Sequence, residues 1–200
     1  MVALSGTDLL GLRRRTLDIL FYLFHIKENK IFTHLSLREK KALLSFARKL
    51  PSSSVIVEIG SYLGASSVFL AKGLRSGGKL YCVDTWKNQG MSEGARDTYE
   101  AFLSNTKDYA DRIVPLRGFS CDVAKSFDKK IDLMFFDGDH SEDGVKGDVS
   151  SWFPKLKPGA VVVFHDYGWA EGVQKTIRED VLPLTSSHKS LPNMWWGILK

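Results

Sequence analysis

Five short apolar segments alternate with helix-like segments along this 200-residue chain, and that alternation constrains the fold more than any other feature. Short runs of β-branched and aromatic residues, bounded by turn residues, are typical of buried strands. The predicted strands are residues 55–57, 80–83, 113–116, 131–136 and 160–164. The predicted helices are residues 64–74, 95–109, 141–153 and a segment around 173–181. Helices between consecutive strands imply a largely parallel sheet that is covered on both faces.

The two ends of the predicted sheet have their own signals. Pro115 lacks a backbone N–H, so it places the strand at residues 113–116 near a sheet edge. Pro158 and Gly159 predict a turn into the fifth strand, and the apolar tail that ends at Leu199 predicts two closing strands. We therefore expect an α/β fold: a Rossmann-like, doubly wound, mostly parallel seven-stranded sheet with helices on both faces, plus N-terminal helices.

Residues 1–50 form a predicted segment of their own. In residues 1–35, apolar side chains cover more than one face of one or two helices, and such helices must bury their apolar surface. Ser36 and Glu39 form a capping box that begins a further helix, which Pro51 ends. We expect residues 1–50 to be a helical cap or a dimerisation segment that makes the protein a homodimer, and residues 51–200 to be the domain that binds ligands.

Charge and composition argue against several classes of protein. The net charge is +5, but residues 1–50 hold 10 Lys and Arg against 4 Asp and Glu, which leaves 18 against 19 in the remainder. A body close to neutral argues against nucleic-acid binding, and no apolar run approaches the ~20 residues of a membrane span. The two cysteines, Cys82 and Cys121, favour a reducing interior over a disulfide scaffold. We therefore expect a cytoplasmic protein with no nucleic-acid partner and no membrane span.

Polar residues gather where the predicted strands end. Ligands of such sheets bind beyond the carboxyl ends of the strands, and charges buried there must be paired or bind something. The residues at these ends are Glu58, Gly60, Asp84, Ser120, Asp122, Asp137, Asp139, His140, His165 and Asp166. Four strand ends with carboxylates or imidazoles predict a binding site at this edge.

The first of these strand ends predicts the kind of ligand. Gly60 and Gly64 flank a turn between strand and helix, and the missing Cβ of Gly60 lets a ligand approach the backbone. Tyr62 stands where a dinucleotide fingerprint needs a glycine, which disfavours a pyrophosphate and an NAD-dependent reductase. Asp84, about 25 residues further on, suits the two hydroxyls of a ribose. The pattern favours a nucleoside without a pyrophosphate.

Four motifs in this order carry a family resemblance. They are Val57–Gly64 (VEIGSYLG), Val83–Trp86 (VDTW), Phe136–Ser141 (FDGDHS) and Phe164–Asp166 (FHD). The chain resembles class I S-adenosylmethionine-dependent methyltransferases over residues 52–183, most of all the branch of macrolide-sugar O-methyltransferases and cephalosporin-hydroxylase-like proteins. The resemblance implies methylation of a hydroxyl on a small-molecule acceptor, a sugar or a secondary metabolite, with residues 51–200 as the methyltransferase domain.

The resemblance also implies roles for individual residues. Those that would bind S-adenosylmethionine are Glu58, Gly60, Ser61, Asp84 at the ribose, Trp86 and Ser120 at the adenine, and Asp137. Asp137, His165 and Asp166 match positions that hold a divalent metal in metal-dependent relatives, usually magnesium. His165 departs from those relatives, since imidazole prefers transition metals; it would be a ligand of such a metal, or a catalytic base, or there is no metal. His140 matches a histidine that acts as general base in the macrolide-sugar branch.

Two other functions remain open at this point. Asp137-Gly138-Asp139 is an Asp-x-Asp motif, as in metal-dependent sugar-nucleotide transferases, but that function leaves the glycine turn at Gly60 unexplained. A non-catalytic nucleoside-binding module that joins a partner through residues 1–35 would also fit the pattern.

Overall fold

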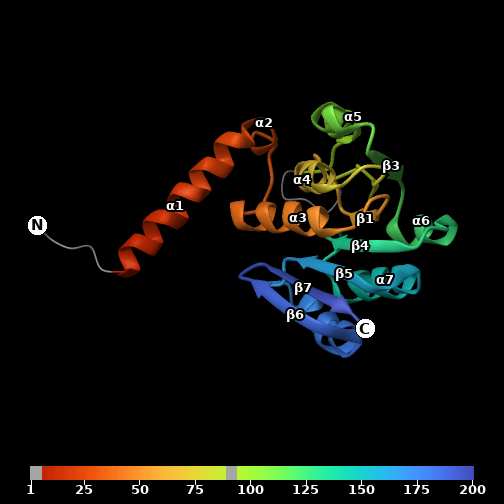
Figure 1. The fold of residues 1–200 in the computed structure, drawn as a ribbon. Helices are drawn as coiled ribbons and strands as arrows, with labels where there is room; N and C mark the ends of the chain where they lie inside the picture. The colour runs from red at the N-terminus through yellow and green to blue at the C-terminus, as the bar shows by residue number, and fades with distance from the viewer. Residues whose placement is uncertain (1–5, 89–93) are drawn as a thin grey trace, which may run out of the picture.

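A single seven-stranded sheet forms the centre of the computed structural model, which describes residues 6–88 and 94–200 (Figure 1). Its strand order is β3-β2-β1-β4-β5-β7-β6. The first five strands run parallel, and β7 pairs antiparallel with both β5 and β6. The strands are β1 (Val55–Ile59), β2 (Lys79–Asp84), β3 (Ile113–Arg117), β4 (Ile131–Phe136), β5 (Leu156–His165), β6 (Thr185–Leu191) and β7 (Met194–Leu199). The predicted fold class is confirmed.

Helices cover both faces of this sheet. The α-helices of the described residues are α1 (Gly6–Phe24), α2 (Ile26–Asn29), α3 (Leu37–Lys49), α4 (Ala65–Gly73), α5 (Tyr99–Thr106), α6 (Ser120–Ser126), α7 (Glu142–Trp152) and α8 (Glu171–Thr176), and those from α3 to α8 pack against the sheet. Successive residues of a strand point to opposite faces, so neighbours such as Met134 and Phe135 enter different cores. One core joins the sheet to α6, α7 and α8, and the other joins it to α3, α4 and α5. Burial on both faces explains why the strands read as continuous apolar runs.

Most elements match the sequence predictions, but α6 was not predicted, α8 ends at Thr176 within the predicted segment around 173–181, and two further elements differ. Strand β3, which contains Pro115, is an edge strand as predicted. The predicted helix at residues 95–109 is shorter, because α5 begins at Tyr99 and ends at Thr106 before a 3₁₀ turn. The predicted turn at Pro158 and Gly159 lies inside β5, where the pairing with β4 shifts register. Residues 89–93, between the predicted strand at 80–83 and the predicted helix at 95–109, lie outside the described residues.

The N-terminal segment divides at α3. Helix α3 begins with the predicted capping box between Ser36 and Glu39, and its residues Leu43 and Ala47 are fully buried in the core of the sheet. Helix α1 instead projects away from the body (Figure 1). Among the described residues, no helix is long and apolar enough to cross a membrane.

Candidate active site

The carboxyl ends of β1, β2, β4 and β5 meet at one edge of the sheet, and they bring the predicted polar residues together. Gly60 shows how closely the ends of β1 and β4 approach. A Cβ on Gly60 would lie 2.0 Å from the carbonyl oxygen of Asp137, and the residue has a φ of +83°. Glycine is therefore required here because the Asp137 backbone fills the space beside it, in addition to any close approach by a ligand.

Glu58 is a buried carboxylate beside this turn. It has no exposed surface, it accepts a hydrogen bond from Ser67, and its Oε2 lies 3.3 Å from the sulfur of Cys82. Burial raises the pKa of Glu58. Its Oε1 and the hydroxyl of Ser61 are buried and make no hydrogen bond of good geometry, although Ser61 and Ser66 lie close enough to lower the pKa of Glu58. Buried polar atoms are rarely left unpaired, so these two atoms fit a site for a polar ligand.

Asp84 is held by the turn it faces. Its two carboxylate oxygens accept the backbone N–H groups of Tyr62 at 2.8 Å and Trp86 at 2.7 Å, and burial raises its pKa. Each carboxylate oxygen has a second lone pair, so a fixed Asp84 can still accept hydroxyl groups from a ligand.

The Trp86 side chain does not lie where the resemblance implied. It is fully buried against Tyr99 and Phe102, with ring centroids 4.9 and 4.8 Å away, and its Nε1 donates to the carbonyl of Tyr62 at 3.0 Å. A ring packed on these neighbours exposes no face, so the indole cannot flank an adenine in this arrangement. The physical reason is that burial of this large apolar ring in the core lowers the free energy of the fold more than exposure at the sheet edge would.

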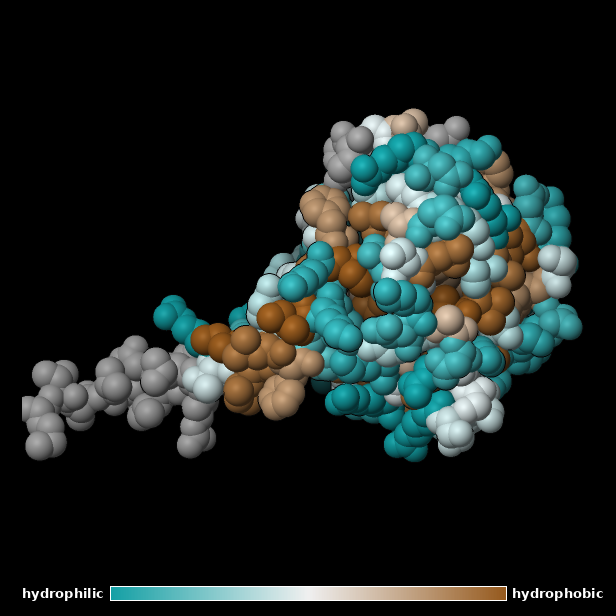
Figure 2. All heavy atoms as spheres, turned by 90° about the horizontal axis from the view of Figure 1, so that it is seen from above, coloured by the Kyte–Doolittle hydropathy of each residue, from teal (hydrophilic) through white to brown (hydrophobic). Residues whose placement is uncertain are grey.

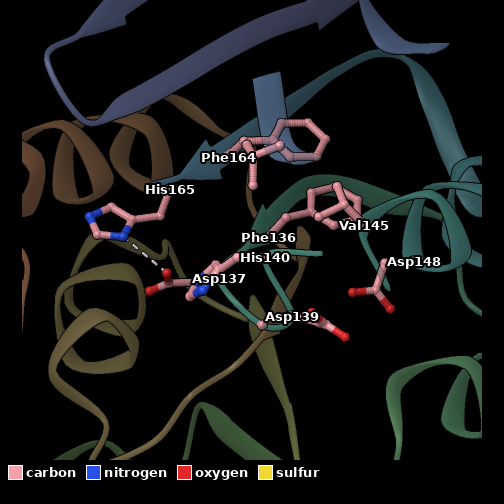
Figure 3. A pocket seen from close by; sticks show the side chains of 10 residues that line it. Phe136, Asp137, Asp139, His140, Val145, Asp148, Phe164 and His165 are labelled. Atoms are coloured by element: carbon pink, nitrogen blue, oxygen red, sulfur yellow. Dashed lines mark ion pairs between the residues drawn. The ribbon is translucent and has the colours of Figure 1, made fainter. Parts of the chain in front are cut away.

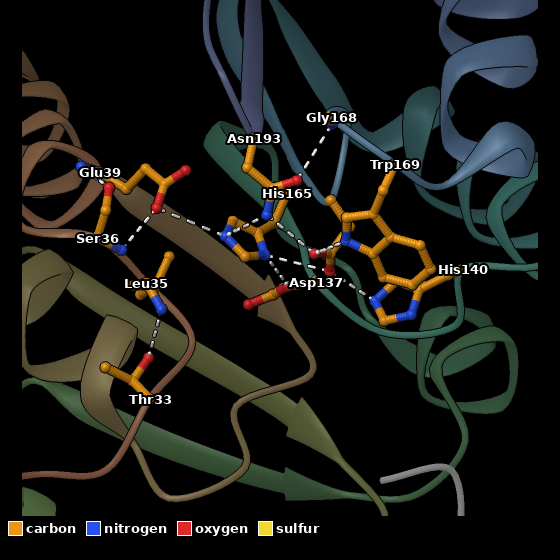
Figure 4. Close-up of polar contacts among 11 residues, drawn as sticks. Thr33, Leu35, Ser36, Glu39, Asp137, His140, His165, Gly168, Trp169 and Asn193 are labelled. Atoms are coloured by element: carbon orange, nitrogen blue, oxygen red, sulfur yellow. Dashed lines mark hydrogen bonds and ion pairs between the residues drawn. The ribbon is translucent and has the colours of Figure 1, made fainter. Parts of the chain in front are cut away.

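His165 lies at the centre of a charged cluster at the ends of β4 and β5 (Figure 3). Its Nδ1 is 3.0 Å from Asp137 and 3.1 Å from Asp166, and its Nε2 is 3.7 Å from Glu39 (Figure 4). Burial acts to lower the pKa of His165, but the charge of Asp137 and the hydrogen bonds to the three carboxylates outweigh it and raise the pKa to about 12. The buried ring is therefore a cation that compensates its acidic neighbours.

His140 occupies a different position from His165. Its ring is half-buried, and its Nε2 lies 2.8 Å from Oδ2 of Asp166. The hydrogen bond to Asp166 raises the pKa of His140 and outweighs its partial burial. A partly exposed imidazole that a carboxylate orients is the arrangement of a general base.

The candidate metal ligands differ from the predicted set. Within the described part of the chain, Asp137, His140 and Asp166 offer ligand atoms that lie within 4.8 Å of one another. The prediction named His165 in place of His140. His165 is instead enclosed by carboxylates at both ring nitrogens, which leaves no lone pair free while the ring is charged.

Two residues that contact His165 were missed by sequence reasoning. Glu39 was predicted only as a helix cap, and Asn193 carried no signal because it lies in the turn between β6 and β7. Asn193 donates to Asp166 at 3.1 Å and lies 3.4 Å from Nε2 of His165, and its Oδ1 accepts the N–H of Gly168. The β6–β7 hairpin and α3 therefore both contribute side chains to the site. The sequence prediction considered only residues at the carboxyl ends of parallel strands, and neither element lies at such an end.

A small pocket continues from this cluster toward α7 and α8 (Figure 3). It is lined by Phe136, Asp137, Gly138, Asp139, His140, Val145, Asp148, Phe164, His165 and Val173. Next to it, the predicted site residue Ser120 accepts a hydrogen bond from Nε1 of Trp152 at 2.8 Å. Burial raises the pKa of Asp148 to about 6, although the nearby Ser120 hydroxyl acts to lower it.

The family follows from a match to known proteins. A family model described as a methyltransferase domain matches residues 57–167, more than half of the chain. The chain belongs to this methyltransferase family. The matched span includes the glycine turn, Asp84, His140 and Asp166, so the predicted resemblance to methyltransferases is confirmed.

Two curated relatives match this methyltransferase domain in part. An uncharacterised protein, y4gI, from Sinorhizobium fredii is 29% identical over 116 residues, which cover 56% of this chain and 13% of the relative. A protein of Mycobacterium sp. (strain JLS), provisionally named an O-methyltransferase, is 28% identical over 131 residues, which cover 62% of this chain and 53% of the relative. The match thus spans about half or less of the length of these relatives.

Solved structures of methyltransferases share the fold. An O-methyltransferase from Bacillus cereus in complex with SAH has a TM-score of 0.66 at 16% identity, and the match covers 92% of this chain and 91% of that one. The O-methyltransferase NovP has a TM-score of 0.71 at 13% identity, with 84% and 82% covered. CalS11, a TDP-rhamnose 3'-O-methyltransferase of calicheamicin biosynthesis, has a TM-score of 0.61 at 18% identity, with 99% and 96% covered.

The methyltransferase domain should be more stable at neutral pH when Asp148 is replaced by Asn. A pKa that is raised to about 6 means that the folded state holds a proton which the unfolded state releases near pH 3.8. Ionised Asp148 therefore destabilises the fold above about pH 6, and this cost shrinks as the pH falls toward 3.8. We expect Asp148→Asn to raise the free energy of unfolding by roughly 1–3 kcal/mol at pH 7.5, and by less at pH 4.5.

Urea denaturation at both pH values measures this difference. Asp122→Asn, which removes an exposed carboxylate paired with Lys125, is the matched control and should change stability little at either pH. A gain for Asp148→Asn that is the same at pH 4.5 and pH 7.5 would contradict the assignment.

Proposed function

We propose that this protein is an S-adenosylmethionine-dependent O-methyltransferase that methylates a hydroxyl of a small molecule, a sugar or a secondary metabolite. The observation that carries the proposal is the contact between the glycine turn and the charged cluster of Asp137, His140, His165 and Asp166, called the imidazole cluster from here on. The Asp137 backbone fills the space beside Gly60, so the glycine turn and the Asp166–His140 pair border one site. The family match and the methyltransferases of the same fold, one with SAH bound and one that acts on TDP-rhamnose, support it.

The residues around the turn fit the cofactor. Asp84 would accept the ribose hydroxyls, and Oε1 of Glu58 with the hydroxyl of Ser61 would gain the partners they lack. Gly60 and Asp137 would separate the cofactor from the acceptor, and Ser120, which hydrogen-bonds Asp148 of the pocket, would lie beside the adenine. Trp86 would contribute through its backbone N–H, which holds Asp84.

The chemistry asks two things of this chain. S-adenosylmethionine supplies the methyl group, and the protein must align the acceptor oxygen with it, which can contribute ~7–11 kcal/mol. The protein must also remove the proton of the acceptor hydroxyl. His140 would accept that proton at the ring nitrogen directed at the acceptor, while Asp166 fixes the ring and stabilises the imidazolium that forms. Charged His165 holds Asp137 and Asp166 in place.

A divalent metal is a second way to activate the hydroxyl. Asp137, His140 and Asp166 would hold it, since one imidazole and two carboxylates suit a transition metal better than magnesium. Such a metal would lower the pKa of a bound acceptor hydroxyl.

Cys121 is exposed and Cys82 buried, and both thiols are free, which supports a reducing, cytoplasmic location for the enzyme.

Asp84→Asn should weaken the binding of S-adenosylmethionine at least tenfold, because the neutral amide loses one acceptor and the charge that favours two hydroxyl donors. Isothermal titration calorimetry with and without a chelator measures this affinity. Asp108→Asn, which removes an exposed carboxylate beside Lys27, should bind the cofactor like the wild type. Equal affinity for Asp84→Asn and the wild type would contradict the cofactor site, and no binding by the wild type would contradict the proposed function.

His140→Ala should lower kcat for methyl transfer by ~10²–10⁴-fold and leave cofactor affinity unchanged, because the base acts only in the chemical step. The measurement is a methyl-transfer assay on hydroxylated acceptors, with metal analysis of the same sample. If His140 is a metal ligand, the variant will also lose bound metal, and a chelator will abolish wild-type activity. Unchanged activity in His140→Ala would contradict both roles.

We also propose that α1 joins two copies of the chain. The exposed apolar residues at its end are Leu17, Ile19, Leu20, Tyr22, Leu23, Phe24 and, just beyond it, Ile26. Phe21 faces the body and stacks on Phe69, so the opposite side is uncovered, as the apolar patch on the projecting helix in Figure 2 illustrates. A standard protein interface covers ~800 Å² per partner, and this patch would form its apolar centre.

The chemistry of this patch suits a second copy of the chain. Residues 19–24 carry no charge, and Arg13, Arg14 and Arg15 precede them on the same helix, so two such patches can meet without repulsion in a two-fold contact. Sedimentation equilibrium should give twice the chain mass of 22.5 kDa.

The double variant Leu23→Glu, Phe24→Glu should sediment as a monomer, because it places charges in the contact. Leu184→Glu, at a half-exposed leucine far along the chain, should leave the dimer intact. A monomeric wild type at tens of micromolar would contradict the interface.

A further inference from the structure

Trp169 is an exposed aromatic side chain at the edge of the imidazole cluster. It lies in the loop between β5 and α8, and it is 62% exposed. The other tryptophans are at least partly covered, since Trp86, Trp152 and Trp195 are buried and Trp196 packs on Phe46. A single exposed apolar residue needs no explanation in itself, but the contacts of this one are specific.

Two contacts hold the indole in a fixed orientation. Its Nε1 donates to Oδ1 of Asp166 at 2.7 Å, and its ring centroid lies 5.2 Å from that of His140 at an interplanar angle of 69° (Figure 4). The backbone adds a turn, in which the N–H of Trp169 donates to the carbonyl of Asp166 at 3.2 Å. The same carboxylate therefore positions both the candidate base and the indole, and the exposed ring is rigid rather than free.

We propose that Trp169 is the platform on which the acceptor stacks. The proposal rests on the function proposed above, and it specifies the acceptor as a hydroxyl-bearing ring whose flat face covers the indole while its hydroxyl points to His140. Large rigid aromatic side chains provide binding area at a low cost in conformational entropy. Both the C–H face of a sugar ring and the face of a phenol can stack on an indole.

Because Asp166 holds both Trp169 and His140, the indole would orient the acceptor as well as bind it. The indole and the imidazole meet edge to face, so a ring that lies on one presents its edge to the other. A stacked ring would thus bring a ring hydroxyl, rather than a ring face, to His140. Alignment of this kind is what the chain must supply for an in-line transfer.

The substitutions separate stacking from structural support of Asp166. Trp169→Phe keeps a flat ring and loses the N–H that Asp166 accepts, whereas Trp169→Ala loses both. The contacts of Asp166 to His140 and Asn193 do not involve the indole, so we expect both variants to retain them. Trp196→Phe, at a half-buried tryptophan away from the cluster, is the matched control.

Acrylamide quenching of tryptophan fluorescence tests the platform without turnover. The protein is saturated with S-adenosylhomocysteine and titrated with methyl rhamnoside as the sugar probe or catechol as the phenolic probe. We expect one probe to protect a quenchable component in the wild type and in Trp196→Phe, and that component to be absent from Trp169→Phe. The probe that protects identifies the class of ring.

Kinetics with the protecting ring complete the test. Trp169→Ala should raise KM about tenfold or more, and Trp169→Phe should stay within about threefold of the wild type because it still stacks. Equal losses in both variants would mean that the residue only supports Asp166, and this would overturn the proposal. So would the absence of protection by either probe while S-adenosylhomocysteine still binds. Failure of the proposed function is distinguishable, because the wild type would then bind neither S-adenosylmethionine nor S-adenosylhomocysteine in calorimetry.

Discussion

The buried cation of His165 holds together carboxylates that would otherwise repel one another at the ends of two adjacent strands. Asp137 closes β4, Asp166 follows β5, and both lie within 3.1 Å of the same ring nitrogen. Leaving either charge buried and alone would cost several kcal/mol. Hydrogen bonds from His140 and His165 hold the pKa of Asp166 well below its usual range despite burial, so this carboxylate keeps its charge, whereas burial raises the pKa of Asp137. That charge in turn orients His140, Trp169 and Asn193.

The same cluster ties the N-terminal segment to the candidate active site. Glu39 accepts the N–H of Ser36 at 2.7 Å in the capping box, and its carboxylate also faces Nε2 of His165. A helix cap is a local interaction between neighbours in sequence, whereas the contact with His165 spans most of the chain. The Glu39 carboxylate thus fixes both the first residue of α3 and the contact between α3 and the site. Because α1 and α2 precede α3, this contact also links the N-terminal helices to the imidazole cluster.

The two halves of the site are joined through backbone rather than side chains. Gly60 and Asp137 touch at the ends of β1 and β4, neighbouring strands of the sheet. A backbone contact leaves little freedom for either loop, so the turn that would bind the cofactor and the cluster that would remove a proton keep a fixed spacing. Fixed spacing is the main requirement of a transfer reaction in which the protein aligns the two reactants.

The sequence by itself determined the sheet and the edge at which the site forms. Parallel strands buried on both faces need continuous apolar runs, and the polar residues that end those runs must then share one edge, so Asp84, Asp137, His140 and Asp166 could be placed together. Even the edge position of β3 followed from Pro115, because proline cannot donate to a neighbouring strand.

Tertiary structure alone decided what each side chain does at that edge. No local pattern shows that Trp86 turns into the core, that His165 rather than His140 is enclosed by acids, or that Glu39 and Asn193 arrive from α3 and the closing hairpin. These outcomes depend on contacts between residues far apart in the chain, where burial and charge compensation are settled only when the elements pack. Sequence periodicity fixes the elements, and packing fixes which atoms of the site meet.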